Sequence, residues 1–236
     1  MHGDTRAGRT VGALILLQMA GSGVVNGPLV APLRAPEGIL DQASAHATQL
    51  GLAALVGVGT EALWLGMAIT LAALLWPGAR ALALWLLALA TASVAAAMLE
   101  SATLMSLVSL SQSYAHAAPD SRVHLAAVHV VATAAHDWAH LLARLLNGAT
   151  IGVLYLALYR TRLVPRVLPA IGFGCVALML GSLARPFFGP DVLFALLAPV
   201  GLSQLALSLW LLVRGFRVAS TPGVAAASPA PLRGGP

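Results

Sequence analysis

The segment ALALWLLALATASVAAAML, residues 81–99, contains no charged residue. As a helix that rises 1.5 Å per residue it would span about 28 Å, close to the roughly 30 Å thickness of the hydrocarbon core of a bilayer. The whole chain shares this character, because 59% of its 236 residues are hydrophobic and only 9% are charged. Its mean hydropathy is +0.87. This composition excludes a soluble globular protein, whose helices carry charged faces toward water.

Six apolar segments predict an all-α integral membrane bundle with six transmembrane helices. The expected spans cover approximately residues 11–33, 50–75, 81–110, 137–159, 166–184 and 191–213, and the third and fourth extend into a polar connection. Turn-forming stretches separate the spans, such as WPGAR at residues 76–80 and RPFFGPD at residues 185–191. Three prolines, Pro28, Pro32 and Pro36, predict an extended exit from the first span.

The domain organisation is expected to be simple. We predict one transmembrane domain over residues 1–217 and a disordered tail over residues 218–236, because the tail is rich in proline, alanine and glycine and holds one charge, Arg233. The single cysteine, Cys175, can form no internal disulfide.

The arginines predict the orientation. Six spans place the N-terminus, the WPGAR turn, the RTRLVPR loop and the C-terminus on one side of the membrane. That side would carry nine arginines: Arg6, Arg9, Arg80, Arg160, Arg162, Arg166, Arg214, Arg217 and Arg233. The other side would carry only Arg34, Arg122 and Arg185. Since basic residues near span ends are retained in the cytoplasm, we expect a bacterial plasma-membrane protein with both termini cytoplasmic. All thirteen basic residues are arginine, which indicates codon bias, so the high pI implies no nucleic-acid partner.

Several polar groups interrupt the fourth span in HDWAHLLARLLNG, residues 136–148. At 100° per residue, one arc of about 80° contains six polar side chains. They are His129, Thr133, His136, His140, Arg144 and Asn147. An ionisable group within a span costs about 2.5–3.5 kcal/mol on insertion scales, so it normally faces the protein interior and finds a partner. We therefore expect this stripe to face the bundle.

Two glutamates in other spans are the expected partners of the stripe. Glu61 would lie about 16 Å below the outer surface and Arg144 about 10–12 Å below it, and Glu100 also falls in the outer half. Because an arginine keeps its charge, Arg144 is expected to pair with Glu61 or Glu100. The sequence thus predicts an outer-facing polar pocket formed by Glu61, Glu100, His136, His140, Arg144 and Asn147. It would bind or pass a small anionic or lipidic ligand, with Arg144 as anchor for a carboxylate or phosphate.

An alternative is a metal-dependent intramembrane enzyme of the hydrolase type. His136 and His140 have the spacing that places two imidazoles on one helical face, and Glu100 could complete a zinc or iron site. The positive charge of Arg144, one turn from His140, opposes a metal ion there. We therefore expect no cofactor, and the enzyme remains the second hypothesis.

The C-terminal half of the chain resembles a known family. The segment NGATIGVLYLALYRTRLVPRVLPAIGFG at residues 147–174 and the ending LSQLALSLWLLVRGF at residues 202–216 are similar to a bacterial membrane family known as domain of unknown function 4386. The resemblance extends over residues 8–217 and implies the same membrane fold. Ala97 stands where the family commonly has an arginine three residues before a glutamate, here Glu100, and Gln204 stands where a glutamate is usual. The resemblance implies no biochemical activity.

Overall fold

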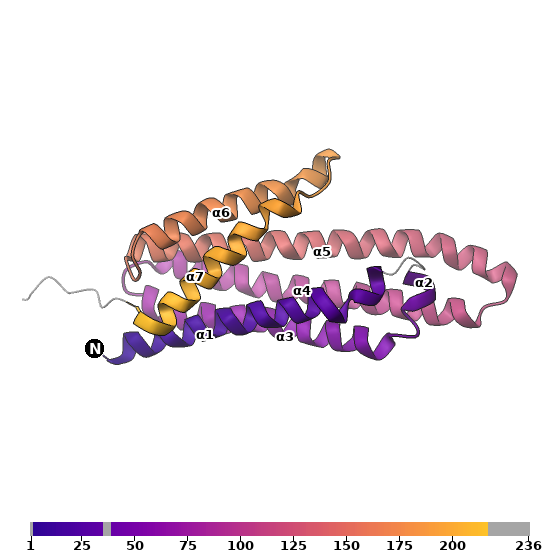
Figure 1. Ribbon diagram of the computed structural model, residues 1–236, viewed down its shortest axis with the longest axis horizontal. Helices are drawn as coiled ribbons and strands as arrows, with labels where there is room; N and C mark the ends of the chain where they lie inside the picture. Colours follow the sequence, from indigo (N-terminus) through magenta and orange to yellow (C-terminus); the bar gives the residue numbers. More distant parts are fainter. Residues whose placement is uncertain (1, 35–38, 217–236) are drawn as a thin grey trace, which may run out of the picture.

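The computed structural model describes residues 2–34 and 39–216, in which six long helices run back and forth along one axis (Figure 1). The long helices are α1 (His2–Val24), α3 (Ala47–Leu75), α4 (Arg80–His116), α5 (Pro119–Thr161), α6 (Val167–Ala184) and α7 (Ala198–Arg214). Short helical turns lie between them, namely η1 (Val25–Leu29), η2 (Ala31–Arg34), α2 (Ile39–Gln42), η3 (Arg185–Phe188) and η4 (Phe194–Leu196). Six helical segments are long and apolar enough to cross a membrane, which confirms the all-α, six-span prediction. The predicted disordered tail lies outside the described residues.

Helix α4 packs against its neighbours through a regular seam of small and apolar residues. Apart from Val108, the buried positions follow alternating spacings of three and four: Ala83, Leu86, Ala90, Ser93, Ala97, Leu104, Leu107 and Ser111. This spacing is typical of left-handed helix pairs, and small side chains in it let the backbones approach closely. Glu100 occupies the same register between Ala97 and Leu104. The packing of α4 therefore directs this carboxylate toward the interior of the bundle.

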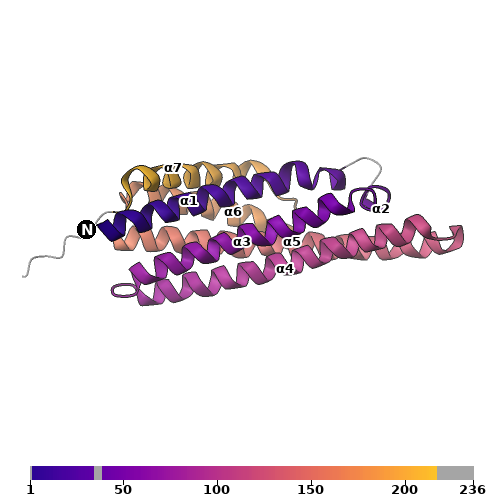
Figure 2. The same cartoon turned by 90° about the horizontal axis from the view of Figure 1, so that it is seen from below.

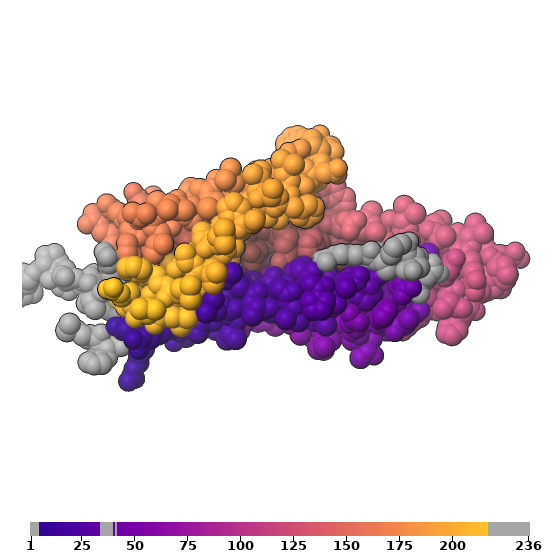
Figure 3. Space-filling view, in the orientation of Figure 1, coloured from indigo at the N-terminus to yellow at the C-terminus, as the bar shows by residue number. Residues whose placement is uncertain are grey.

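Helices α4 and α5 are longer than a bilayer requires. They contain 37 and 43 residues, which correspond to about 55 and 64 Å of helix. Their hairpin projects past the other helices in two orthogonal views (Figures 1 and 2), and the space-filling view shows the same extension (Figure 3). The polar connection expected between the third and fourth spans is therefore itself helical.

A tight turn at Ala117 and Ala118 joins the two helices of this hairpin. Ala118 is extended, with ψ of 153°, as residues before proline usually are, and Pro119 stands in the first turn of α5. Arg122 Nε donates a hydrogen bond of 3.2 Å to the carbonyl of Ala117. Because the turn needs only two residues, both helices continue almost to the tip.

The exit from the first span differs from the prediction. Instead of an extended strand, α1 continues into the π-helical turn η1, which contains Pro28, and then into η2. Proline removes a backbone donor and widens a helical turn. Gln49 of α3 donates to the carbonyls of Pro28 (2.8 Å) and Leu29 (3.2 Å). This long-range contact stabilises a helical conformation that the local sequence disfavours. Residues 35–38, including Pro36, lie outside the described part of the chain.

Most described arginines gather at one end of the molecule, here termed the basic end. They are Arg6, Arg9, Arg80, Arg160, Arg162, Arg166 and Arg214, whereas Arg34, Arg122 and Arg185 belong to η2, the start of α5 and η3, which lie away from this end (Figure 1). Three of the arginines at the basic end stack on aromatic rings. The distance from the guanidinium carbon to the ring centre is 4.6 Å for Arg80 on Trp76, 5.2 Å for Arg166 on Tyr159 and 5.7 Å for Arg214 on Trp210. Aromatic and basic residues at helix ends are typical of a membrane surface.

Candidate functional site

Three helices bring one arginine and two glutamates together. Arg144 of α5 lies 3.9 Å from Glu61 of α3, between Nη1 and Oε1, and 3.5 Å from Glu100 of α4, between Nη2 and Oε2. The side chains are 27%, 6% and 20% exposed, respectively. The sequence left open which glutamate pairs with Arg144, and the structure pairs it with both. Charges so poorly solvated require such partners, because burial of an unpaired charge is costly.

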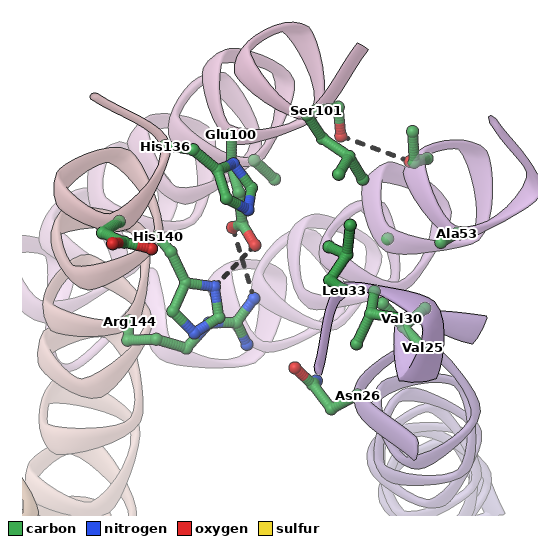
Figure 4. A pocket seen from close by; sticks show the side chains of 15 residues that line it. Val25, Asn26, Val30, Leu33, Ala53, Glu100, Ser101, His136, His140 and Arg144 are labelled. Atoms are coloured by element: carbon green, nitrogen blue, oxygen red, sulfur yellow. Dashed lines mark hydrogen bonds and ion pairs between the residues drawn. The ribbon is translucent and has the colours of Figure 1, made fainter. Parts of the chain in front are cut away.

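Hydrogen bonds extend this ionic cluster. His140 Nδ1 lies 2.7 Å from Glu100 Oε1, and Asn147 Nδ2 donates to the Glu61 carboxylate at 3.1 and 3.3 Å. His136 Nδ1 lies 3.0 Å from the hydroxyl of Thr103 on α4. In Figure 4 the side chains of His140 and Arg144 point toward Glu100 from the neighbouring helix. The part of the helical stripe from His136 to Asn147 is therefore the face of α5 whose side chains contact α3 and α4.

The structure brings together all six residues proposed as a site, although the stripe continues beyond them. We term Glu61, Glu100, His136, His140, Arg144 and Asn147 the polar cluster. His129 and Thr133 lie further along the projecting part of α5, where their side chains interact with each other at 3.3 Å. They are half-buried and belong to the projecting hairpin.

A cavity of about 250 Å³ adjoins the polar cluster. Its polar lining includes Asn26, Glu100, Ser101, His136, Asp137, His140 and Arg144, and its apolar lining includes Val25, Val30, Leu33, Ala53, Ala54, Ala97 and Leu104. Figure 4 shows His136, His140 and Arg144 on one side and Val25, Val30 and Leu33 opposite them. The cavity is therefore amphipathic, with its charged side on α4 and α5 and much of its apolar side on η1, η2 and α3.

Sequence reasoning missed the contribution of the first span. Val25 and Asn26 belong to the π-helical turn η1, and Asn26 Nδ2 donates to the Ser22 carbonyl at 2.9 Å. Pro28 was the available signal, because a proline near the end of a span indicates an irregular turn. Irregular turns of the π-helical kind occur frequently at functional sites. Thr103 was also missed, although it lies three residues after Glu100 and hence on the same helical face.

Two positions at which the resemblance implies a departure from the family are buried. Ala97 is 4% exposed and lines the cavity, so its small side chain leaves space beside Glu100. Gln204 of α7 is 6% exposed, and its Nε2 has no hydrogen-bond partner among the described residues.

The three residues proposed as metal ligands contact other side chains in the structure. Within residues 2–34 and 39–216, no group of three or more His, Cys, Asp or Glu side chains is placed to hold a metal ion. The three proposed ligands have other contacts: His136 meets Thr103, while His140 and Glu100 meet each other.

Comparisons with known proteins support the family resemblance. The family model described as "Domain of unknown function (DUF4386)" matches residues 7–215. No curated protein and no solved structure matches the chain. The match covers most of the chain, reaches all six long helices and contains the polar cluster. The chain therefore belongs to the DUF4386 family, which is described as a domain of unknown function, and its own described residues form six helices able to span a membrane.

Proposed function

We propose that this multi-pass membrane protein binds a small amphipathic ligand in the cavity beside the polar cluster. The observation that carries the proposal is the division of the cavity lining, with Glu100, His140 and Arg144 on one side and Val25, Val30 and Leu33 on the other. A volume of about 250 Å³ lies just below the range of about 300–1,000 Å³ for drug-sized ligands, so the ligand is small.

The charges of the cavity favour a cationic polar end on this ligand. Arg144 suggested an anionic ligand from the sequence, but Glu61 and Glu100 both lie within 4 Å of its guanidinium. Of these two carboxylates only that of Glu100 lines the cavity, and the carboxylate of Asp137 lines it as well. An added anion would compete with these carboxylates for one guanidinium, whereas an ammonium group would find an excess of acceptors. The proposed ligand is thus an amphipathic amine or a lipid with a cationic headgroup.

The proposed location is the plasma membrane, with the basic end in the cytoplasm and the polar cluster toward the outside. The gathering of described arginines and stacked aromatic residues at one end supports this orientation. A ligand would then reach the cavity from the outer leaflet or from the external solution.

Octylammonium and octanoate are suitable probes, because they share an apolar chain and differ in the charge of the polar end. We expect octylammonium to bind the full-length protein in detergent saturably and to raise its unfolding temperature, and octanoate to do neither. Ala97→Phe should abolish binding by filling the cavity, and Ala95→Phe, at an exposed position of the same helix, should not. Glu100→Gln should weaken binding at least tenfold by removing an acceptor charge.

The two probes and the matched phenylalanine variants also give results that would refute the proposal. Binding that is unchanged in Ala97→Phe would show that the probe enters the micelle or another site. Saturable octanoate binding that is lost in Arg144→Ala would reverse the assigned charge and restore the anionic ligand.

A further inference from the structure

A second cavity, of about 570 Å³, lies at the basic end of the molecule. It is formed where the end of α3 and the start of α4 meet the end of α5. Its walls include Leu74, Leu75, Gly78, Ala79, Arg80, Leu82, Arg160 and Leu163. This cavity shares no residue with the one beside the polar cluster. Any ligand it holds would therefore contact residues other than those proposed to bind the amphipathic amine.

Both charged residues of this cavity are arginines, and neither forms an ion pair with a carboxylate among the described residues. In the described chain every ion pair involves Glu61 or Glu100, and Glu61 lies about 21 Å along α3 from its end at Leu75. Arg80 stacks on the Trp76 ring at 4.6 Å, which leaves the guanidinium edge free to donate hydrogen bonds. Arg160, in the last turn of α5, lines the same cavity and is exposed. Two guanidinium groups on one cavity suit a phosphate group, because each can donate paired hydrogen bonds to its oxygens.

The remaining walls of this cavity suit a phosphate that carries an apolar chain. Leu74, Leu75, Leu82 and Leu163 form its apolar lining. The first turn of α4 completes the wall, and its Ala79 N-cap offers no side chain to the backbone N–H groups. Basic pockets between transmembrane helices at the cytoplasmic surface are known to hold anionic lipid headgroups.

We propose that this cavity binds the phosphate of an anionic phospholipid, held between Arg80 and Arg160. The phosphate oxygens accept hydrogen bonds from both guanidinium groups, and the acyl chains lie along the leucines toward the bilayer. Free inorganic phosphate offers the same anionic oxygens and would use the same two arginines.

Titration of the full-length protein in detergent tests this site with three probes: dioctanoyl phosphatidylglycerol, dioctanoyl phosphatidylcholine and inorganic phosphate. We expect saturable binding of phosphatidylglycerol, binding of phosphatidylcholine at least tenfold weaker, and competition by phosphate only at much higher concentration. Phosphate that competes as strongly as the lipid would identify the free anion as the ligand at the same arginines.

Matched double variants separate this site from a diffuse basic surface. Arg80→Gln/Arg160→Gln should weaken phosphatidylglycerol binding at least tenfold. Arg162→Gln/Arg214→Gln removes the same charge from the basic end, at residues outside the cavity lining, and should leave binding within twofold. Arg80→Lys/Arg160→Lys should retain part of the affinity, and an unfolding temperature of Arg80→Gln/Arg160→Gln close to that of wild type would exclude misfolding as the cause of its loss. Equal weakening in the first two variants, equal binding of both lipids, or no saturable binding would overturn the proposal.

Discussion

At the residue scale, Arg144 determines whether two buried carboxylates are tolerated. Its guanidinium lies 3.9 Å from Glu61 and 3.5 Å from Glu100, but the two glutamates are not equivalent. Glu100 is 20% exposed and also contacts His140, whereas Glu61 is 6% exposed and otherwise receives hydrogen bonds from Asn147. Loss of the arginine therefore leaves Glu61 as the less compensated charge.

Replacement of Arg144 by alanine should destabilise the protein in detergent by about 2 kcal/mol, less than for a fully buried pair because the arginine is partly exposed. Adding Glu61→Gln should recover more of the lost stability than adding Glu100→Gln. Thermal unfolding of the four proteins, wild type included, measures both effects. If neither double variant recovers stability, the stability lost in Arg144→Ala does not come from leaving these carboxylates without a partner.

His140 offers a test that separates a hydrogen-bonding role from a metal-binding one. Its Nδ1 lies 2.7 Å from Glu100 Oε1, and glutamine can supply a donor at similar reach. We expect His140→Gln to unfold within about 1 kcal/mol of wild type, while His140→Leu loses about 1–3 kcal/mol because Glu100 lacks this donor. Metal analysis of the same preparations provides the check. Stoichiometric zinc or iron in wild type that disappears in His140→Gln would favour the metal-dependent enzyme.

At the element scale, the fold depends on close contacts between helices that glycine permits. Gly8 and Gly12 of α1 lie against the end of α7, and a Cβ atom at Gly12 would approach the Ser208 carbonyl oxygen to 2.9 Å. A methyl group there must push the two backbones apart. This contact also brings the N-terminal part of α1 next to Gly215, so that both described termini lie at the basic end.

Gly12→Ala should destabilise the protein by about 1–3 kcal/mol, since overpacking at a backbone contact forces the helices apart. Gly66→Ala is the matched control, because a methyl group added at position 66 of α3 would enter open space. That variant should show no loss, since alanine has the higher helix propensity. Thermal unfolding in detergent compares the two substitutions, and an equal effect of both would show that α1 and α7 are not in close contact at Gly12.

The projecting part of the α4–α5 hairpin should be exposed to water. In a Cys175→Ser background, Ser113→Cys and Val130→Cys should react with a membrane-impermeant maleimide added to intact cells, because both positions are exposed on the projection. Thr91→Cys is equally surface-exposed on α4 but lies about 17 Å from its start, within the bilayer, and should not react. Labelling at position 91 with none at position 113 would contradict the prediction, because it would place Ser113 in the bilayer and Thr91 in water.

At the scale of the whole molecule, the distribution of arginines predicts its orientation. Reporter fusions after Gly78 and at the C-terminus should be cytoplasmic, and a fusion near Asp120 should be external, because basic residues near the ends of spans are retained inside. A cytoplasmic reporter at Asp120 would reverse the orientation and turn the polar cluster toward the cytoplasm.

The sequence alone determined the properties that the bilayer imposes on each segment separately. A segment that crosses the hydrocarbon core must be apolar, about 20 residues long and hydrogen-bonded within itself as a helix. These requirements apply to each segment separately, so composition was enough to identify six spans and an all-α bundle. The polar stripe of α5 could be recognised for a similar reason, since helical periodicity is a local property. The candidate residues were thus identifiable from spacing and from the cost of charge in a span.

Only the tertiary structure decided how these segments meet. The contact of Arg144 with Glu61 and Glu100 joins three helices, and its geometry depends on how each helix is rotated against the next, which side-chain packing sets. The same holds for η1, where the local rule for Pro28 favoured an extended exit and Gln49, distant in sequence, stabilised a π-helical turn. The apolar side of the cavity depends on that turn. Hydropathy is a sum over neighbouring residues, whereas a cavity is formed by side chains that only packing brings together.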